Sequence, residues 1–122
     1  MRSVSPEQLD ELRSEEGVFV LDIRPEADFQ RSHIDGSYNA PVYHELRRGE
    51  SDVLIEYLDD IPEAATVVTV CKAGVVAKKA TSTLADRGYD AATLIGGYTG
   101  WRQYEANTLL YRILAAIRSL LP

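Results

Sequence analysis

The segment from Thr66 to Ala77, TVVTVCKAGVVA, decides the fold of this 122-residue chain. Its first five residues are all β-branched, and a short run of this kind is typical of a strand buried on both faces. Cys71, the only cysteine in the chain, follows directly, and a helical pattern begins near Val75. We therefore expect a central strand that ends at a lone thiol, then a short loop and a helix.

The position of Cys71 makes it the candidate catalytic residue. The first turn of a helix has unpaired N–H groups and a partial positive charge, and both stabilise a thiolate or an anionic substrate. Lys72 adds a positive charge beside the sulfur. The alternative is a small buried apolar residue at a strand end, which is the usual role of an isolated cysteine. The loop and helix context favours a functional thiol.

The composition indicates one soluble globular domain, because 45% of the residues are hydrophobic and 26% are charged. We find no signal-like apolar run and no segment long enough to span a bilayer. One cysteine cannot form an internal disulfide or a cysteine-based metal cluster, so we expect a cytoplasmic protein. The net charge of −6 disfavours nucleic acid as a partner.

The charges are unevenly distributed along the chain. Residues 1–63 hold 16 acidic and 6 basic side chains, whereas residues 64–122 hold 3 acidic and 7 basic side chains. The part that contains Cys71 therefore has a net charge of +4, which favours a small anionic substrate.

Helical and strand patterns alternate through the rest of the chain. A helix with a capping box at Ser5 and Gln8 comes first, and strands are expected at residues 18–21, 38–40 and 92–95. This alternation predicts an α/β fold with a mostly parallel sheet and helices on both faces. Sites in such sheets lie beyond the carboxyl ends of the strands. We therefore expect residues 22–24, the Cys71 loop and the Gly96-Gly97 turn to converge there.

Four motifs together resemble the rhodanese-like domain family over roughly residues 4–104. LDIR at residues 21–24 is similar to the family's LDVR strand end, and HIDGSYNAP at residues 33–41 is similar to its GHIPGAINIP segment. CKAGVVA at residues 71–77 lies where the family has its active-site loop. The sequence from Gly88 to Trp101 resembles the family's GY…VxxLxGGxxxW ending. Each motif is weak alone, but their shared order and spacing make a strong case.

This resemblance implies a rhodanese-like fold with a central five-stranded parallel sheet, and a sulfurtransferase activity without a cofactor. In the family, the catalytic cysteine takes the outer sulfur of a small anionic donor such as thiosulfate, holds it as a persulfide, and passes it to a thiol, cyanide or protein acceptor. Here Cys71 would be the nucleophile. The loop that would bind the substrate through its N–H groups consists of Lys72, Ala73, Gly74, Val75 and Val76.

The loop departs from the family pattern at its fifth position after the cysteine, where Arg or Thr is frequent. Val76 occupies that position here, and it offers no side-chain hydrogen bond, which costs roughly 1.5–3 kcal/mol at a charged site. Thiosulfate would then be a poorer donor than a persulfide or a protein. A catalytically weak binding or regulatory module is the alternative function, and a redox-sensing thiol would need an intermolecular partner.

The sixth residue after the cysteine excludes a neighbouring class of enzymes. Cysteine-dependent phosphatases and arsenate reductases need an Arg there to hold the oxyanion through two hydrogen bonds. Ala77 occupies the position in this chain, so we expect no phosphatase activity.

Other polar and aromatic side chains have two possible roles. Asp22 and Arg24 would support the active loop through hydrogen bonds, or else Asp22 caps the next helix and Arg24 makes a surface pair. His33 is expected to hold a turn. His33 and His44, so placed, do not suggest a metal site. Tyr98 and Trp101 are expected to pack against the loop or line the pocket mouth; the two aromatic residues follow the Gly96-Gly97 turn.

The chain divides into a rhodanese-like domain at residues 1–104 and an amphipathic helix at residues 105–122, which Asn107 and Thr108 would cap. Apolar residues at helical spacing form a broad stripe on this helix. We expect the stripe to pack on the domain or to form a homodimer. A helix on a membrane surface is a third possibility, and two arginines give it little basic surface.

Overall fold

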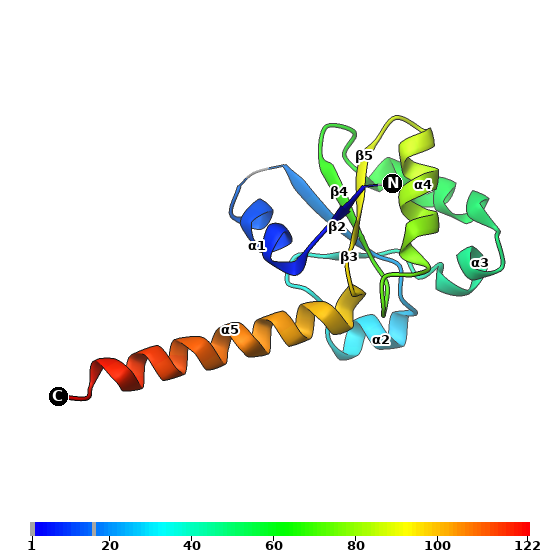
Figure 1. Cartoon of the computed structure of the whole chain (residues 1–122). Coiled ribbons are helices and arrows are strands. Elements are labelled where there is room, and N and C mark those ends of the chain that lie inside the picture. The colour runs from blue at the N-terminus through cyan, green and yellow to red at the C-terminus, as the bar shows by residue number, and fades with distance from the viewer. Residues whose placement is uncertain (1, 16) are drawn as a thin grey trace.

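The computed structural model describes residues 2–15 and 17–122, which form a five-stranded sheet with helices on both faces (Figure 1). The strands are β1 (Ser3–Val4), β2 (Val18–Asp22), β3 (Tyr38–Asn39), β4 (Thr66–Val70) and β5 (Asp90–Leu94). All neighbouring strands are parallel, in the order β1-β5-β4-β2-β3. The predicted α/β fold is confirmed.

The helices are α1 (Pro6–Ser14), α2 (Glu26–Arg31), α3 (Tyr43–Arg47), the 3-10 helix η1 (Ser51–Asp60), α4 (Ala77–Asp86) and α5 (Gly97–Ser119). The expected capping box starts α1, where the Gln8 N–H donates to Ser5 Oγ at 3.1 Å and the Ser5 N–H donates to Gln8 Oε1 at 2.8 Å. This exchange satisfies two N–H groups that a helix start otherwise leaves unpaired.

Alternate residues of the strands build two hydrophobic cores, one on each face of the sheet. Leu21 and Val67 join the core under α3, η1 and α4, while Val20 and Val68 join the core under α1 and the start of α5. The central strand β4 pairs with β2 on one side and β5 on the other, and its residues 67–70 are buried. Its β-branched composition is therefore explained by burial on both faces.

The sequence predicts a helix near the Gly96-Gly97 turn and a separate helix after Asn107 and Thr108, but the structure has a single helix. α5 runs without a break from Gly97 to Ser119, so Asn107 and Thr108 lie inside a helix and cap nothing. Its first turns are buried at Gly97, Tyr98 and Trp101, whereas the remainder projects away from the sheet (Figure 1). The projecting apolar side chains are exposed. The boundary at residue 104 and a dimer role for residues 105–122 stay predictions.

None of the helices formed by residues 2–15 and 17–122 combines the length and the apolar character that crossing a membrane requires.

Candidate active site

Three segments meet at the carboxyl ends of the central strands, as the sequence predicts. β2 and β4 are in parallel register from Val18–Thr66 to Asp22–Val70, and the Ile23 N–H donates to the Val70 oxygen at 2.8 Å. The Cys71 loop follows β4 directly, and the turn after β5 lies against it, because the Tyr98 N–H donates to the Cys71 oxygen at 2.8 Å. The site is thus assembled from three parts of the chain.

The Cys71 sulfur lies beneath its own loop and accepts two backbone hydrogen bonds. The Gly74 N–H donates to Sγ at 3.1 Å and the Ala77 N–H donates to Sγ at 3.4 Å. The residue is 2% exposed. Ala77 was not among the predicted loop residues. It is the first residue of α4, so its N–H is one of the groups that a helix start leaves unpaired. Both N–H groups would stabilise negative charge on the sulfur.

The side chains of the loop point in different directions. Lys72, Ala73 and Val75 are exposed, and Val75 is 68% exposed. Val76 is buried and packs into the core under α3, η1 and α4. Of the predicted loop residues, Gly74 contributes a backbone donor to the sulfur and Lys72 contributes the positive charge; the substrate-binding roles of all five stay predictions.

Two glycines allow the turn after β5 to approach the loop closely. Gly74 and Gly97 have φ angles of +87° and +59°, in the left-handed region that favours glycine. A Cβ atom on Gly97 would overlap the Cys71 carbonyl oxygen and would lie 2.7 Å from the Gly74 nitrogen. The Gly96-Gly97 pair therefore fixes the backbone of the loop, a contact that the pattern of glycines alone could not specify.

Asp22 and Arg24 form a buried ion pair at the end of β2. Arg24 Nε lies 3.1 Å from both carboxylate oxygens, and Arg24 Nη2 donates to Asp22 Oδ2 at 2.8 Å and to the Ser32 oxygen at 2.8 Å. The pair is buried rather than superficial, and no side chain caps α2. Asp22 therefore does not cap α2, and Arg24 does not form a surface pair. These hydrogen bonds offset the free-energy cost of removing the two charges from water.

The contact between this ion pair and the loop passes through Tyr98. Among the described residues, no hydrogen bond joins the Asp22 or Arg24 side chain to residues 71–76. The Arg24 guanidinium lies 4.0 Å from the centre of the Tyr98 ring, and the Tyr98 N–H binds the Cys71 oxygen. Tyr98 thus lies beside the site, as expected, whereas Trp101 is buried in the core under α1. Direct support of the loop by Asp22 and Arg24 stays a prediction.

Lys72 lines two cavities beside the loop. The first, of about 280 Å³, is rich in cations and is lined by Lys72, Arg24, Asp28, Arg31, Ser32, Tyr98, Thr99 and Arg102. The second, of about 290 Å³, is lined by Lys72, Arg24, Pro25, Asp28, Tyr43 and His44. Within residues 2–15 and 17–122, neither Lys72 nor Arg102 takes part in a salt bridge. These two cations can therefore attract an anion to the cavity next to the loop.

A buried hydroxyl network holds the start of α4 in place behind the sulfur. Thr69 Oγ1 lies 2.8 Å from Thr81 Oγ1, which lies 2.6 Å from Thr93 Oγ1. The Ala77 oxygen lies 3.1 Å from Thr69 Oγ1 and 3.2 Å from Thr81 Oγ1, within hydrogen-bond distance of both hydroxyls. Ala77, whose N–H faces the sulfur, is thus held by β4, the strand that directly precedes Cys71, and by its own helix. The sequence pattern gave no sign of this network.

The histidines lie apart from this chemistry. His33 Nδ1 is 2.8 Å from the Phe29 oxygen, and its ring stacks on Phe29 with 3.9 Å between the ring centres, which fits a structural role. His44 lines the second cavity. In the part of the chain that the structure describes, no cluster of three or more His, Cys, Asp or Glu side chains is suited to hold a metal ion.

Comparisons with known proteins show which proteins this chain resembles. The thiosulfate sulfurtransferase GlpE of Shewanella oneidensis is 27% identical over 107 residues, which cover 87% of this chain and 95% of that protein. The protein of the same name from Pseudoalteromonas translucida is 30% identical over 104 residues, which cover 82% of this chain and 88% of that protein.

A solved structure shares the fold. The rhodanese-related protein of Thermoplasma volcanium superposes with a TM-score of 0.70 over 85% of this chain and 93% of its own, at 23% identity. The family profile of the rhodanese-like domain matches residues 5–104. The chain therefore belongs to the rhodanese-like domain family.

Proposed function

We propose that this chain is a rhodanese-type sulfurtransferase that carries sulfane sulfur as a persulfide on Cys71. The observation that carries the proposal is the pair of N–H groups, from Gly74 and Ala77, that face the Cys71 sulfur at the end of the central strand. Relatives at 27% and 30% identity are named thiosulfate sulfurtransferases, which supports the same reaction class here.

The reaction would proceed in two steps that need no outside oxidant or reductant. First, the Cys71 thiolate attacks the outer sulfur of the donor; the donor's S–S bond breaks, and its electron pair leaves with sulfite when the donor is thiosulfate. Second, a thiolate or cyanide acceptor attacks the terminal sulfur of the persulfide. The S–S bond to Cys71 then breaks, and its electron pair restores the thiolate.

The residues around the sulfur would stabilise the anionic species of both steps. The N–H groups of Gly74 and Ala77 are already directed at the sulfur, so they need no rearrangement when negative charge develops there. Lys72 and Arg102 line the cavity beside the loop and would attract an anionic donor. Val76 is buried and contributes no polar group, so donor recognition would depend on backbone donors and these cations.

The alternative function is a binding or regulatory module that keeps the fold and has lost turnover. The apolar Val76 side chain and the 2% exposure of Cys71 favour it, because a nucleophile must be accessible to its substrate. The two hydrogen bonds to the Cys71 sulfur favour catalysis instead, since a merely structural thiol needs no such donors.

Intact-protein mass spectrometry would separate the two functions. The chain would be incubated with thiosulfate and, in a second arm, with a low-molecular-weight persulfide, and compared with Cys71→Ala. A gain of one sulfur atom that requires Cys71 and is reversed by cyanide or a thiol is expected, and the donor that loads the protein would identify the substrate class. If neither donor loads Cys71, or if Cys71→Ser keeps full sulfur transfer, the persulfide mechanism is wrong.

The proposed chemistry also fits a cytoplasmic location, because a persulfide carrier needs its thiol in the reduced state. Fractionation of the source cells, followed by detection of the chain, would test this proposal.

A further inference from the structure

The projecting part of α5 carries a broad apolar surface. We call this surface the apolar stripe. Each of its side chains is between 48% and 83% exposed, and they recur at helical spacings of three and four residues. The stripe consists of Leu109, Leu110, Ile113, Leu114 and Ile117 of α5, followed by Leu120 and Leu121 directly after the last helical residue.

Apart from Leu109, which lines a cavity between α5 and α1, the stripe lies on the side of α5 that faces away from the domain. At the root of the helix, Trp101 is buried, and Tyr104 and Thr108 are partly buried beside α1. These residues are spaced three and four apart, so they form one contact line along the helix, which continues at Ala115. At about 100° per residue, the stripe is centred roughly opposite this line.

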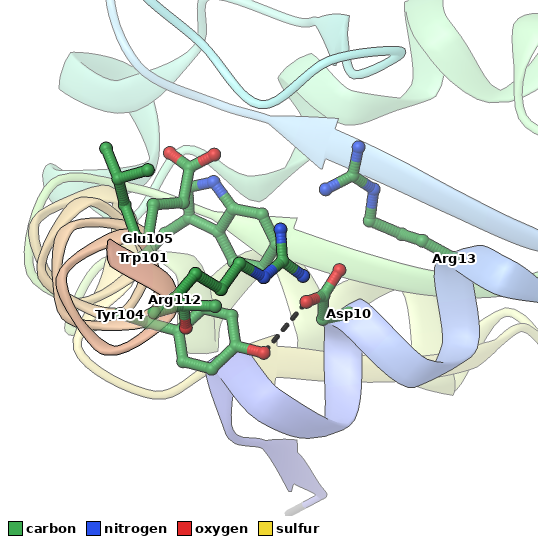
Figure 2. A pocket seen from close by; sticks show the side chains of 8 residues that line it. Asp10, Arg13, Trp101, Tyr104, Glu105 and Arg112 are labelled. Atoms are coloured by element: carbon green, nitrogen blue, oxygen red, sulfur yellow. Dashed lines mark hydrogen bonds between the residues drawn. The ribbon is translucent and has the colours of Figure 1, made fainter. Parts of the chain in front are cut away.

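The root of α5 is anchored, which fixes the direction of the projecting part. Figure 2 shows Tyr104 of α5 hydrogen-bonded to Asp10 of α1, at 2.8 Å, across a cavity of about 240 Å³. The Arg13 guanidinium lies 5.2 Å from the centre of the Trp101 ring. Because the anchored side and the stripe are on opposite sides of one continuous helix, the stripe cannot be covered by its own domain unless the helix breaks.

The size of the stripe points to a protein partner. With exposed fractions of 48–83%, its seven large side chains present on the order of 700 Å² of surface, which exceeds the ~300–600 Å² of the largest apolar patch on a typical monomer. It is comparable to the ~800 Å² that each partner contributes to a standard interface.

The charges of the helix favour a second copy of the chain over a lipid surface. Beyond Glu105, α5 carries only Arg112 and Arg118 as charged residues, and both lie outside the stripe. Two identical stripes can therefore meet without burying a charge, and pairing through the same surface on both subunits is the commonest form of oligomer. A helix that binds membranes is typically rich in Lys and Arg, and a net charge of −6 opposes binding to anionic lipids.

We propose that the apolar stripe of α5 pairs with the same stripe on a second copy of this chain, so that the protein is a homodimer joined through its C-terminal helices. The proposal does not depend on the sulfurtransferase function.

The mass of the full chain in solution tests this proposal. Light scattering after size-exclusion chromatography is expected to give twice the chain mass of 13.6 kDa. Ile113→Glu places a charge near the centre of the stripe and should reduce the mass to that of one chain. Ala115→Glu adds the same charge on the opposite side of the helix and should leave the dimer intact. Circular dichroism of both variants would verify that the fold is unchanged.

Three results would overturn the proposal. The wild type could be monomeric at all concentrations, Ile113→Glu could remain dimeric, or the two variants could behave alike. A flotation assay with vesicles of phosphatidylcholine and phosphatidylglycerol gives a further check. Binding of a monomeric wild type, lost in Ile113→Glu, would assign the stripe to a membrane surface instead.

Discussion

Gly97→Ala should damage the candidate active site more than any other single glycine-to-alanine change of similar backbone geometry. The alanine Cβ would overlap the Cys71 oxygen and lie 2.7 Å from the Gly74 nitrogen, and all of these atoms belong to backbone that cannot rotate away. The variant has two costs: about 1–2 kcal/mol for a side chain at positive φ, and about 1–3 kcal/mol for overpacking. We expect a loss of about 2–5 kcal/mol from a domain stability that is typically about 5–15 kcal/mol.

Gly88→Ala is the matched control for this experiment. Gly88 also has a positive φ, +91°, but nothing lies within 4 Å of a Cβ built there. Gly88→Ala should therefore lose only the stability that a side chain at positive φ costs, without the cost of overpacking. The effect of alanine on the unfolded chain is the same in both variants. The difference between the two melting temperatures isolates the close approach at Gly97, and at about 4 °C per kcal/mol it should be about 4–12 °C.

The assay is thermal or urea unfolding, combined with the rate at which iodoacetamide alkylates Cys71 in the folded protein. We expect Gly97→Ala to change this rate, because the loop over the sulfur must shift, whereas Gly88→Ala should leave it unchanged. If the two variants are equally stable and react at the wild-type rate, the turn after β5 does not fix the loop, and the reasoning from close backbone contact is refuted.

Three other changes test the surroundings of the site. Arg24→Ala leaves the Asp22 carboxylate buried without its partner, so urea unfolding should show a loss of about 3–5 kcal/mol, and a loss below 1 kcal/mol would contradict the importance of the pair. Arg102→Gln removes a cation from the cavity beside Lys72 and should raise the KM for thiosulfate by about fivefold, which corresponds to roughly 1 kcal/mol. The kcat should change little, and the effect on KM should be weaker at high salt because salt screens the charge. The hydrogen bond to Asp10 raises the pKa of Tyr104, so this bond should stabilise the fold fully below about pH 10 and progressively less as the pH rises through the raised value. The stability difference between wild type and Tyr104→Phe should accordingly shrink in alkaline solution, and a difference that stays constant would show that the phenol proton is not involved.

The sequence predicts the centre of the fold and the chemistry of the site because both depend on local patterns. The β-branched residues 66–70 must be buried on both faces, and the thiol must then lie at the carboxyl end of a parallel strand. The convergence of residues 22–24, the Cys71 loop and the Gly96-Gly97 turn follows from the same topology, and the structure confirms it.

Other features could not be predicted because they depend on contacts between distant residues. β1 consists of two residues, Ser3–Val4, which is too short to give a pattern, so the fifth strand was expected only from the family resemblance. The pairing of Arg24 with Asp22 and its stacking on Tyr98 require the turn after β5 to lie beside β2. The sequence indicates a helix near the Gly96-Gly97 turn, but not that it continues unbroken to Ser119, because Asn107 and Thr108 look like the start of a separate helix.

The two outermost strands of the sheet, β1 and β3, have a consequence for how this protein behaves at high concentration. Each is only two residues long, so each offers few unpaired backbone groups along its outer side. An exposed strand of ordinary length would act as a template on which an incoming chain could add another strand, and such growth leads to fibres. Here the three longer strands, β2, β4 and β5, lie in the interior of the sheet, where each has a neighbouring strand on both sides. The short edges therefore disfavour open-ended strand addition between molecules, whereas the proposed pairing through α5 would be completed by a single partner.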